Sequence, residues 1–264
     1  MNKFLLLIIG LGFLTSCVNV EETHIKKVGD NDYSLLATVF QQHSPEYKAL
    51  CLQAYNIASA RLIEIKKSGT YKNAPAVVLD IDETVLDNSP FEAKSILENT
   101  SYPTYWEEWM NEANARLVPG VKSFLHLADS LGFEVYYISN RKHKYLDVTI
   151  KNMLDYNLPN SDAAHIFLKT DESSKKARRN KLRVDREIIM LIGDNLNDFD
   201  EVFELSNNDE RIQAVKNLSD EFGDKFIVLP NPLYGEWVKA VLNDSNNLSK
   251  IQRDSILKRR LRSF

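Results

Sequence analysis

The feature that most constrains this fold is a series of five short apolar runs separated by stretches of helical pattern. The runs cover residues 76–79, 135–138, 166–168, 188–192 and 226–229. Strands that alternate with helices are typical of a parallel sheet, because each helix carries the chain back to the edge where the next strand begins. The sequence therefore predicts an α/β fold in which helices flank both faces of a parallel sheet.

The composition excludes several classes of protein. Of 264 residues, 44% are hydrophobic and 27% are charged, which is typical of a globular chain and excludes low-complexity disorder. The formal net charge is −4, from 33 Lys and Arg against 37 Asp and Glu. Because there is no basic excess to neutralise a nucleic-acid backbone, we expect no polynucleotide partner. Two cysteines exclude a fold that depends on several disulfides.

The first residues have the pattern of a signal peptide. Lys3 is followed by an apolar run over residues 4–14 and then by Thr15, Ser16 and Cys17. The run is shorter than the ~20 residues that a membrane-spanning helix needs. Residues 14–17 resemble a bacterial lipobox, which predicts a signal over residues 1–16, cleavage before Cys17 and a lipid on that cysteine. The alternative is a plain secretory signal in which Cys17 is incidental.

The rest of the chain is predicted to form one domain over residues 31–264, after a polar tether over residues 17–30. Ser44 and Pro45 begin an amphipathic helix that ends before Gly69, and this helix extends the core at its N-terminal side. Residues 85–119 are rich in aromatic side chains and have no strong strand signal, which predicts a helical cap insertion. Cys51 is expected to be a buried thiol. The basic residues between 175 and 181 are expected to form a solvated helix face.

Polar residues follow four of the five predicted strands. Asp80 and Asp82 come after the first, residues 139–141 (Ser, Asn, Arg) after the second, Lys169 after the third, and residues 193–198 after the fourth. In parallel α/β sheets, ligands bind beyond the carboxyl ends of the strands. We therefore expect these side chains to form one site.

Acidic residues gathered at such an edge favour a bound cation. Two carboxylates ~4 Å apart repel each other by about 4 kcal/mol at an effective dielectric constant near 20, and a metal ion would remove this repulsion. Oxygen ligands without a cysteine or histidine cluster favour Mg²⁺. The alternative is that Asp80 and Asp82 are helix caps or loop acids. An EF-hand fits poorly, because Val85 and Phe91 stand where that loop needs glycine and glutamate.

The order of these motifs resembles that of the haloacid dehalogenase (HAD) superfamily of phosphatases. The longer strings Asp80-Ile-Asp-Glu-Thr-Val-Leu-Asp-Asn-Ser-Pro, Ile138-Ser-Asn-Arg and Gly193-Asp-Asn-Leu-Asn-Asp-Phe are similar, together with the lipobox, to the class C acid phosphatases of the lipoprotein e, 5′-nucleotidase type. The similarity extends through Asn231-Pro-Leu-Tyr-Gly-Glu-Trp. It implies a Rossmann-like parallel sheet with a helical cap.

The resemblance also implies catalytic roles. Asp80 would be the nucleophile that accepts the phosphoryl group, and Asp82 would be the general acid and then the general base. Ser139 would donate a hydrogen bond to a phosphate oxygen, and Lys169 would offset charge between phosphate and nucleophile. The metal would be Mg²⁺.

Further roles concern the metal and the substrate. The Asp80 carboxylate, the Asp82 backbone carbonyl and Asp194 would bind the ion, and Asp198 would bind a metal-coordinated water or orient the other ligands. Substrate-binding positions implied by the family are Asn140 and Arg141 near the phosphate, with Trp106 and Tyr234 stacking on the substrate base. Without the resemblance, Trp106 and Trp109 would be interpreted as core residues. Phe91 stands where the family would have a tyrosine, so a contact from that hydroxyl is not expected.

The function implied is a Mg²⁺-dependent acid phosphatase that hydrolyses phosphomonoesters, nucleoside monophosphates above all, through an aspartyl phosphate. The family further implies a homodimer, and the lipobox implies a lipid anchor in the bacterial cell envelope, at the outer membrane. Two alternatives stay open. One is a HAD phosphotransferase or phosphomutase, and the other is a non-catalytic surface lipoprotein that uses the fold as a binding module.

Overall fold

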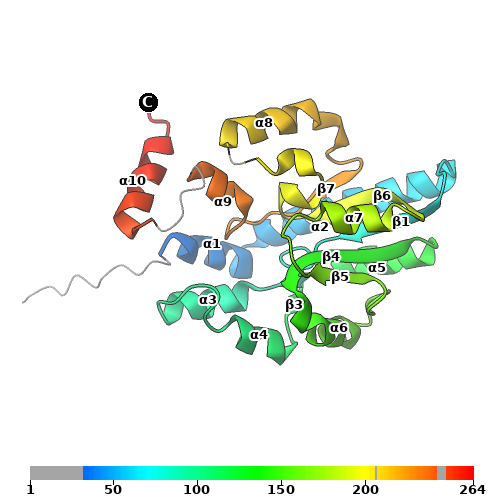
Figure 1. Ribbon diagram of the computed structural model, residues 1–264, viewed down its shortest axis with the longest axis horizontal. Coiled ribbons are helices and arrows are strands. Elements are labelled where there is room, and N and C mark those ends of the chain that lie inside the picture. Colours follow the sequence, from blue (N-terminus) through cyan, green and yellow to red (C-terminus); the bar gives the residue numbers. More distant parts are fainter. Residues whose placement is uncertain (1–31, 206, 243–247) are drawn as a thin grey trace, which may run out of the picture.

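The fold is built on a parallel sheet of five strands in the order β5-β4-β1-β6-β7 (Figure 1). A computed structural model describes residues 32–205, 207–242 and 248–264. All five predicted strands are present, and the α/β prediction is confirmed. Their bounds are β1 Ala74–Leu79, β4 Glu134–Lys142, β5 Ile166–Lys169, β6 Arg186–Gly193 and β7 Phe226–Val228.

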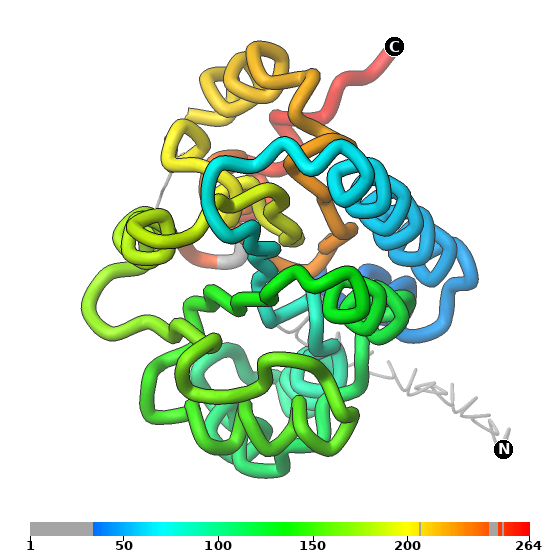
Figure 2. Tube along the Cα trace, turned by 90° about the vertical axis from the view of Figure 1, so that its right-hand side faces the viewer, coloured from blue at the N-terminus to red at the C-terminus, as the bar shows by residue number. Residues whose placement is uncertain are grey.

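The sheet buries apolar side chains on both faces, because successive residues of a strand point to opposite sides. In β1, Val77 and Leu79 belong to one core cluster, whereas Ala76 and Val78 belong to the other. The first cluster includes side chains of α2 (Pro45–Ser68), α5 (Val121–Ser130) and α6 (Leu146–Asp155). The second includes side chains of α7 (Lys176–Leu182) and α8 (Asn208–Asn217). Figure 2 shows α2 and α5 on one side of the sheet and α7 on the other.

The helix predicted after Ser44 has the expected ends. The Ser44 side chain accepts hydrogen bonds from the backbone N–H groups of Glu46 and Tyr47, Pro45 is the first residue of α2, and Gly69 ends the helix with φ +60°. Helix α1 (Asp32–His43), which was not predicted, precedes it. Cys51 lies on α2 and is buried, as expected, and burial raises the pKa of its thiol to about 11.

The insertion between β1 and β4 contains two helices, α3 (Ser89–Leu97) and α4 (Trp106–Glu112). It also contains two short strands, for which the sequence gives no strong signal. Strands β2 (Leu86–Asp87) and β3 (Arg116–Leu117) pair in antiparallel fashion and close the base of the insertion. Strands of two residues each are too short to give a periodic hydrophobic pattern in the sequence.

The predicted signal peptide, Cys17 and the tether lie outside the described residues. Among the helices that are described, none is long and apolar enough to cross a membrane. The remaining elements are η1 His143–Tyr145, η2 Leu196–Asp198, η3 Glu201–Phe203, η4 Ser219–Glu221, α9 Glu236–Val241 and α10 Lys250–Arg260.

Candidate active site

Three aspartates meet at the carboxyl edge of the sheet. Asp80 follows β1, Asp194 follows β6, and Asp198 ends η2. Each offers one carboxylate oxygen, and these oxygens all lie within 4.8 Å of one another. The backbone N–H of Asp80 donates to Ile192 O at 2.9 Å, which ties the start of one loop to the neighbouring strand. The expectation that the polar residues after the strands come together is therefore confirmed for these three.

Gly193 makes the close approach of Asp198 possible. A Cβ atom on Gly193 would lie 2.4 Å from Asp198 Oδ2 and 2.6 Å from Asp198 Cβ, so that no other residue fits without moving the loop. The same carboxylate oxygen accepts a hydrogen bond from the backbone N–H of Asn195 at 3.0 Å. The glycine of this motif thus has a packing role that fixes one acid of the cluster.

Lys175 lies among the aspartates. Its ammonium contacts the Asp80 carboxylate and lies 2.7 Å from Asp198 Oδ1, and its side chain is 6% exposed. The prediction placed Lys169 between nucleophile and phosphate, and the structure corrects it. Lys169 ends β5, and its ammonium lies 3.4 Å from Ser173 Oγ instead. The loop after β5 carries the chain back toward the sheet, so that the lysine just before α7 reaches the aspartates.

The predicted solvated face over residues 175–181 is accordingly wrong for part of that run. Lys175 and Arg179 are four residues apart, which puts them on the same side of a helical segment, and both are buried. Arg179 donates to the backbone carbonyls of Asn197 and Asp198 at 3.2 and 3.1 Å. Lys176 is exposed and pairs with Glu201 at 2.9 Å, as a solvated face predicts.

Burial and mutual repulsion change the acidity of this cluster. Burial raises the pKa of Asp80 to about 7, with the Lys175 ammonium opposing that shift and the carboxylates of Asp198 and Asp82 adding to it. Burial, with the charges of Asp198 and Asp80, raises the pKa of Asp194 well above its ordinary value. For Lys175, burial disfavours the charged form, but the two neighbouring carboxylates outweigh it and raise its pKa.

These residues fit a divalent metal ion. One ammonium cannot neutralise three carboxylates, and the repulsion among these acids adds to the effect of burial in raising the pKa values of Asp80 and Asp194. All the donors are carboxylate oxygens, which suit a hard cation. A divalent ion would favour the ionised form of each acid and so reverse both shifts.

The Asp82 carboxylate is held differently from those of the other aspartates. Its Oδ1 accepts from Arg141 Nε at 2.9 Å and from Asn88 Nδ2 at 2.7 Å, and Arg141 Nη2 lies 2.8 Å away. Its Oδ2 has a longer contact, 3.4 Å, with Ser139 Oγ. Arg141, predicted to bind substrate, lines the cleft but is buried, and it donates hydrogen bonds to Asp82 and to Thr149 Oγ1.

Ser139 and Asn140 lie within β4, which continues past the predicted strand end, and both line the cleft with the acids. Ser139 is fully buried, and its hydroxyl accepts from the backbone N–H of Arg141 at 3.2 Å. Asn140 is exposed, and its side-chain oxygen accepts from Arg178 Nη2 at 2.7 Å. Arg178 Nη1 also donates to Ser139 O at 2.6 Å. Arg178 therefore connects α7 to the strand end that carries the predicted phosphate-binding residues.

Two polar residues orient Asp194. Thr84 Oγ1 donates to Asp194 Oδ1 at 3.1 Å, and Asn231 Nδ2 donates to Asp194 Oδ2 at 2.8 Å. The Asn231 side-chain oxygen accepts from the backbone N–H groups of Leu233 and Tyr234 at 2.8 and 3.4 Å. Asn231 thus joins the acidic cluster to the turn that carries Tyr234.

The acids open into a cleft of about 1050 Å³. Trp106 of α4 is half-buried there, with its ring 4.9 Å from that of Phe91 and 5.7 Å from that of Tyr102. Tyr234 also lines the cleft and is 36% exposed. Both residues predicted to stack on a base therefore share one cleft with Asp80. Trp109, by contrast, donates from its ring nitrogen to Asn88 Oδ1 at 2.8 Å.

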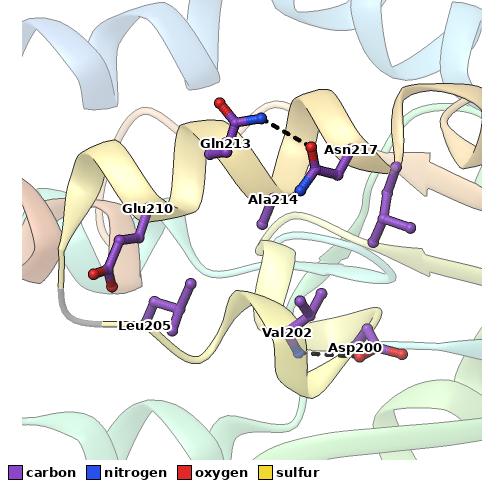
Figure 3. Close-up of a pocket in the computed structure, with 8 residues that line it drawn as sticks. Asp200, Val202, Leu205, Glu210, Gln213, Ala214 and Asn217 are labelled. Atoms are coloured by element: carbon purple, nitrogen blue, oxygen red, sulfur yellow. Dashed lines mark hydrogen bonds between the residues drawn. The ribbon is translucent and has the colours of Figure 1, made fainter.

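A second pocket, of about 500 Å³, lies between η3 and α8 (Figure 3). Among the described residues that line it, none is a lysine or arginine, and its two acids are Asp200 and Glu210. Asp200 accepts from the backbone N–H of Val202 at 3.0 Å, and Gln213 donates to Asn217 at 2.8 Å. The described lining of this pocket therefore offers no cation to offset the charge of a phosphate.

The sequence interpretation missed Lys175, Arg178, Asn88 and Asn231. The two cations stood within a basic run that a helix face explains equally well. Asn88 and Asn231 were within the quoted strings, but nothing in an asparagine's identity shows which acid it bonds to, whether that acid is close in the sequence, as Asp82 is to Asn88, or distant, as Asp194 is from Asn231. The roles of Lys175, Arg178 and Asn231 depend on contacts with residues 95, 38 and 37 positions away in the chain.

Comparisons with known proteins agree with this geometry. The family model described as "HAD superfamily, subfamily IIIB (Acid phosphatase)" matches residues 18–237. The class C acid phosphatase from Bacillus anthracis is 38% identical, with a TM-score of 0.84, and the match covers 89% of this chain and 99% of that one. The same protein with tungstate bound gives the same identity and TM-score and is covered to 98%.

Curated relatives from plants match over a shorter stretch. Vegetative storage protein 1 of Arabidopsis thaliana is 30% identical over 169 residues, which make up 60% of this chain and 54% of that protein. Stem 28 kDa glycoprotein of Glycine max is 27% identical over 176 residues, which make up 60% of this chain and 62% of that protein. The chain thus spans less than two thirds of the length of these relatives.

Proposed function

The chain belongs to the HAD superfamily, subfamily IIIB, of acid phosphatases, and from this premise we propose that it hydrolyses phosphomonoesters with Asp80 as the nucleophile. One observation carries the proposal. The Asp80 carboxylate stands at the carboxyl edge of the sheet, in contact with Lys175 and beside Asp194 and Asp198, and it faces the large cleft. A carboxylate is suited to attack a phosphate when a nearby cation, here Lys175, offsets the negative charge of the phosphate.

In the first step, an Asp80 oxygen attacks phosphorus and the bond from phosphorus to the ester oxygen breaks. The leaving oxygen takes a proton from Asp82. Oδ2 of Asp82 is the oxygen suited to carry that proton, because Oδ1 already accepts from Arg141 and Asn88, whereas Oδ2 has a contact of 3.4 Å with Ser139. The products are an aspartyl phosphate and an alcohol.

In the second step, the Asp82 carboxylate takes a proton from water, and the water oxygen attacks phosphorus. The bond between Asp80 and phosphorus breaks and releases inorganic phosphate, and Asp82 is protonated again. Lys175, which touches Asp80, stabilises negative charge on the phosphoryl oxygens in both steps. Arg178 holds the backbone of Ser139 and the side chain of Asn140 in place beside them.

We propose Mg²⁺ as the metal. The carboxylates of Asp80 and Asp194 and the backbone carbonyl of Asp82 would hold it, with Asp198 orienting them. Such an ion supplies positive charge that polarises the phosphoryl group. Two features support this proposal. Three carboxylates have oxygens within 4.8 Å of one another, and the single positive charge of Lys175 does not neutralise their three negative charges.

We propose nucleoside monophosphates as the substrates, hydrolysed as by a 5′-nucleotidase. The cleft has an aromatic side chain from the insertion, Trp106, and another from the turn after β7, Tyr234. A flat base can stack on an aromatic ring, whereas glycerol phosphate has no ring that could stack.

The location is a separate proposal. Residues 14–17 support cleavage before Cys17 and a lipid anchor in the bacterial cell envelope, at the outer membrane. Cys17→Ser should release the protein from membranes or block its processing. A wild-type protein that is wholly soluble outside the cell, with an unmodified Cys17, would contradict this.

Two rivals can be weighed against the site. A non-catalytic binding module would have no need for both Asp80 and Asp82, and both are present. A phosphomutase acts on phosphorylated metabolites, which are found in the cytoplasm. The predicted lipoprotein signal would direct this chain out of the cytoplasm, and it therefore disfavours a phosphomutase. A homodimer, as the family implies, is compatible with every function considered.

The test is a phosphate-release assay over a panel of phosphomonoesters, with Mg²⁺ and with a chelator. We expect metal-dependent release by the wild type and none by Asp80→Asn. Asp129→Asn, which makes the same change on the exposed end of α5, should leave release unchanged. Phosphatase activity in Asp80→Asn equal to that of the wild type would overturn the proposed nucleophile.

A further inference from the structure

Residues 248–264 differ sharply in charge from the rest of the chain. They contain six Lys and Arg and one Asp, a net charge of +5, in a chain whose formal charge is −4. Most of these residues form α10 (Lys250–Arg260), which lies beyond the residues that the family model matches. A concentrated basic segment in an acidic protein indicates a surface that meets a negatively charged partner.

Five cations of residues 248–264, which we call the basic helix segment, are turned to solvent. Arg253, Arg259, Arg260 and Arg262 are exposed, and the Lys258 side chain is 71% exposed while it pairs with Asp254 at 2.7 Å. Large apolar side chains stand between them and are also exposed: Ile251, Leu261 and Phe264. Exposed apolar groups among cations are typical of segments that lie on a lipid surface.

We propose that the basic helix segment binds the surface of an anionic lipid bilayer. The cations would meet the lipid head groups, and the exposed apolar side chains would enter the boundary beneath them. A polynucleotide would satisfy the cations but would leave Ile251, Leu261 and Phe264 without an apolar environment. The observations therefore favour lipid over nucleic acid.

The position of α10 agrees with a lipid surface as the partner. It lies at the same end of the molecule as α1, on the left in Figure 1 and at the far side in Figure 2. Cys17 precedes the first residue of α1, Asp32, by 15 residues, which span at most about 50 Å. A lipid on Cys17 would thus be held near the end that carries α10.

The surface also has a consequence for the cleft. Arg253 of α10 lines the same cleft as Asp80 and Tyr234. Binding through the exposed cations of α10 would therefore hold one wall of the cleft close to the head groups. The other exposed cations of the basic helix segment do not line the cleft: Lys258, Arg259, Arg260 and Arg262.

The test uses the chain without residues 1–17, which lacks both the apolar run of the predicted signal peptide and Cys17, so that its result does not depend on the proposed anchor or on the proposed activity. It is sedimented with vesicles of phosphatidylcholine alone and of phosphatidylcholine mixed with phosphatidylglycerol. We expect binding to the anionic vesicles, weaker at high salt because ions screen the attraction. We expect no binding to the neutral vesicles.

Variants then assign the binding to this segment. Replacing Arg259, Arg260 and Arg262 with Gln removes three charges, keeps good helix formers and leaves Arg253 of the cleft in place. Each Lys or Arg near an anionic surface contributes about fivefold in affinity, so the triple variant should bind roughly a hundredfold more weakly. A matched triple variant, Lys48→Gln, Lys67→Gln and Lys122→Gln, changes exposed lysines of α2 and α5 and should bind as before.

Three results would overturn the proposal. One is equal binding to neutral and anionic vesicles, and another is equal binding by the two triple variants. The third is retention on RNA in the same buffer without binding to anionic vesicles, which would assign the surface to a polynucleotide. Unchanged unfolding transitions in both triple variants show that any loss of binding is not a loss of folding.

Discussion

Replacing Lys175 with Gln tests the clearest difference between the predicted and the observed site. Lys175 contacts Asp80 and lies 2.7 Å from Asp198, and these side chains are 6%, 9% and 9% exposed. Removing one partner of a buried ion pair costs about 3–5 kcal/mol, because the remaining charge stays buried without compensation. We expect the unfolding free energy of the metal-free protein to fall by this amount. Losing a cation beside the phosphoryl group should also lower kcat by roughly 10²–10³.

Lys169→Gln is the matched control. Lys169 is partly exposed and its ammonium contacts Ser173, not an aspartate. Its replacement should change the unfolding free energy by no more than about 0.5 kcal/mol and leave kcat close to that of the wild type. Urea denaturation and phosphate release, measured on both variants, compare them. If Lys169→Gln loses as much activity as Lys175→Gln, or if Lys175→Gln keeps wild-type stability and turnover, the assignment of Lys175 is wrong.

Three other predictions concern the metal, the cleft and the pH dependence. Asn231→Ala removes a hydrogen bond to Asp194 and should weaken Mg²⁺ binding by about 10- to 100-fold in titration calorimetry, and unchanged affinity would contradict its orienting role. Trp106→Ala and Tyr234→Ala should each lower kcat/KM for a nucleoside monophosphate by about tenfold to a hundredfold and spare glycerol phosphate, whereas equal losses on both substrates would identify them as core residues. Because burial raises the pKa of Asp80 from 3.8 to about 7, the folded metal-free protein holds a proton that the unfolded chain has lost. Its stability should fall as pH rises through that interval, by about 1.4 kcal/mol per pH unit for one proton, and added Mg²⁺ should remove the slope in urea titrations.

The sheet and its acidic edge could be predicted because they depend on local pattern. Apolar runs of strand length identify the strands, and the rule that ligands bind at carboxyl ends directs attention to Asp80 and Asp194. The helix after Ser44 was equally predictable, since Ser44, Pro45 and Gly69 are themselves the signals of its ends. In each case the information lies within a few residues of the feature.

Most of the features that the sequence did not predict depend on contacts between residues that are far apart in the sequence. Helix α1 was not predicted, and two of its apolar residues, Leu35 and Leu36, are exposed and give little periodicity. Lys169 and Lys175 both follow the third strand, and only the path of the loop decides which of them reaches Asp80. A basic run has the same composition whether it is solvated or, as at Arg179, buried against a loop.

The measurement that tests the central claim most directly is the detection of a phosphoryl group on Asp80. Protein mixed with a radiolabelled phosphomonoester and quenched in acid should carry label on the peptide that contains Asp80. Asp82→Asn should accumulate more of it, because the base that activates water is missing, and Asp80→Asn should carry none. Phosphate release without any label on Asp80, even in the Asp82→Asn chain, would contradict covalent catalysis by this residue.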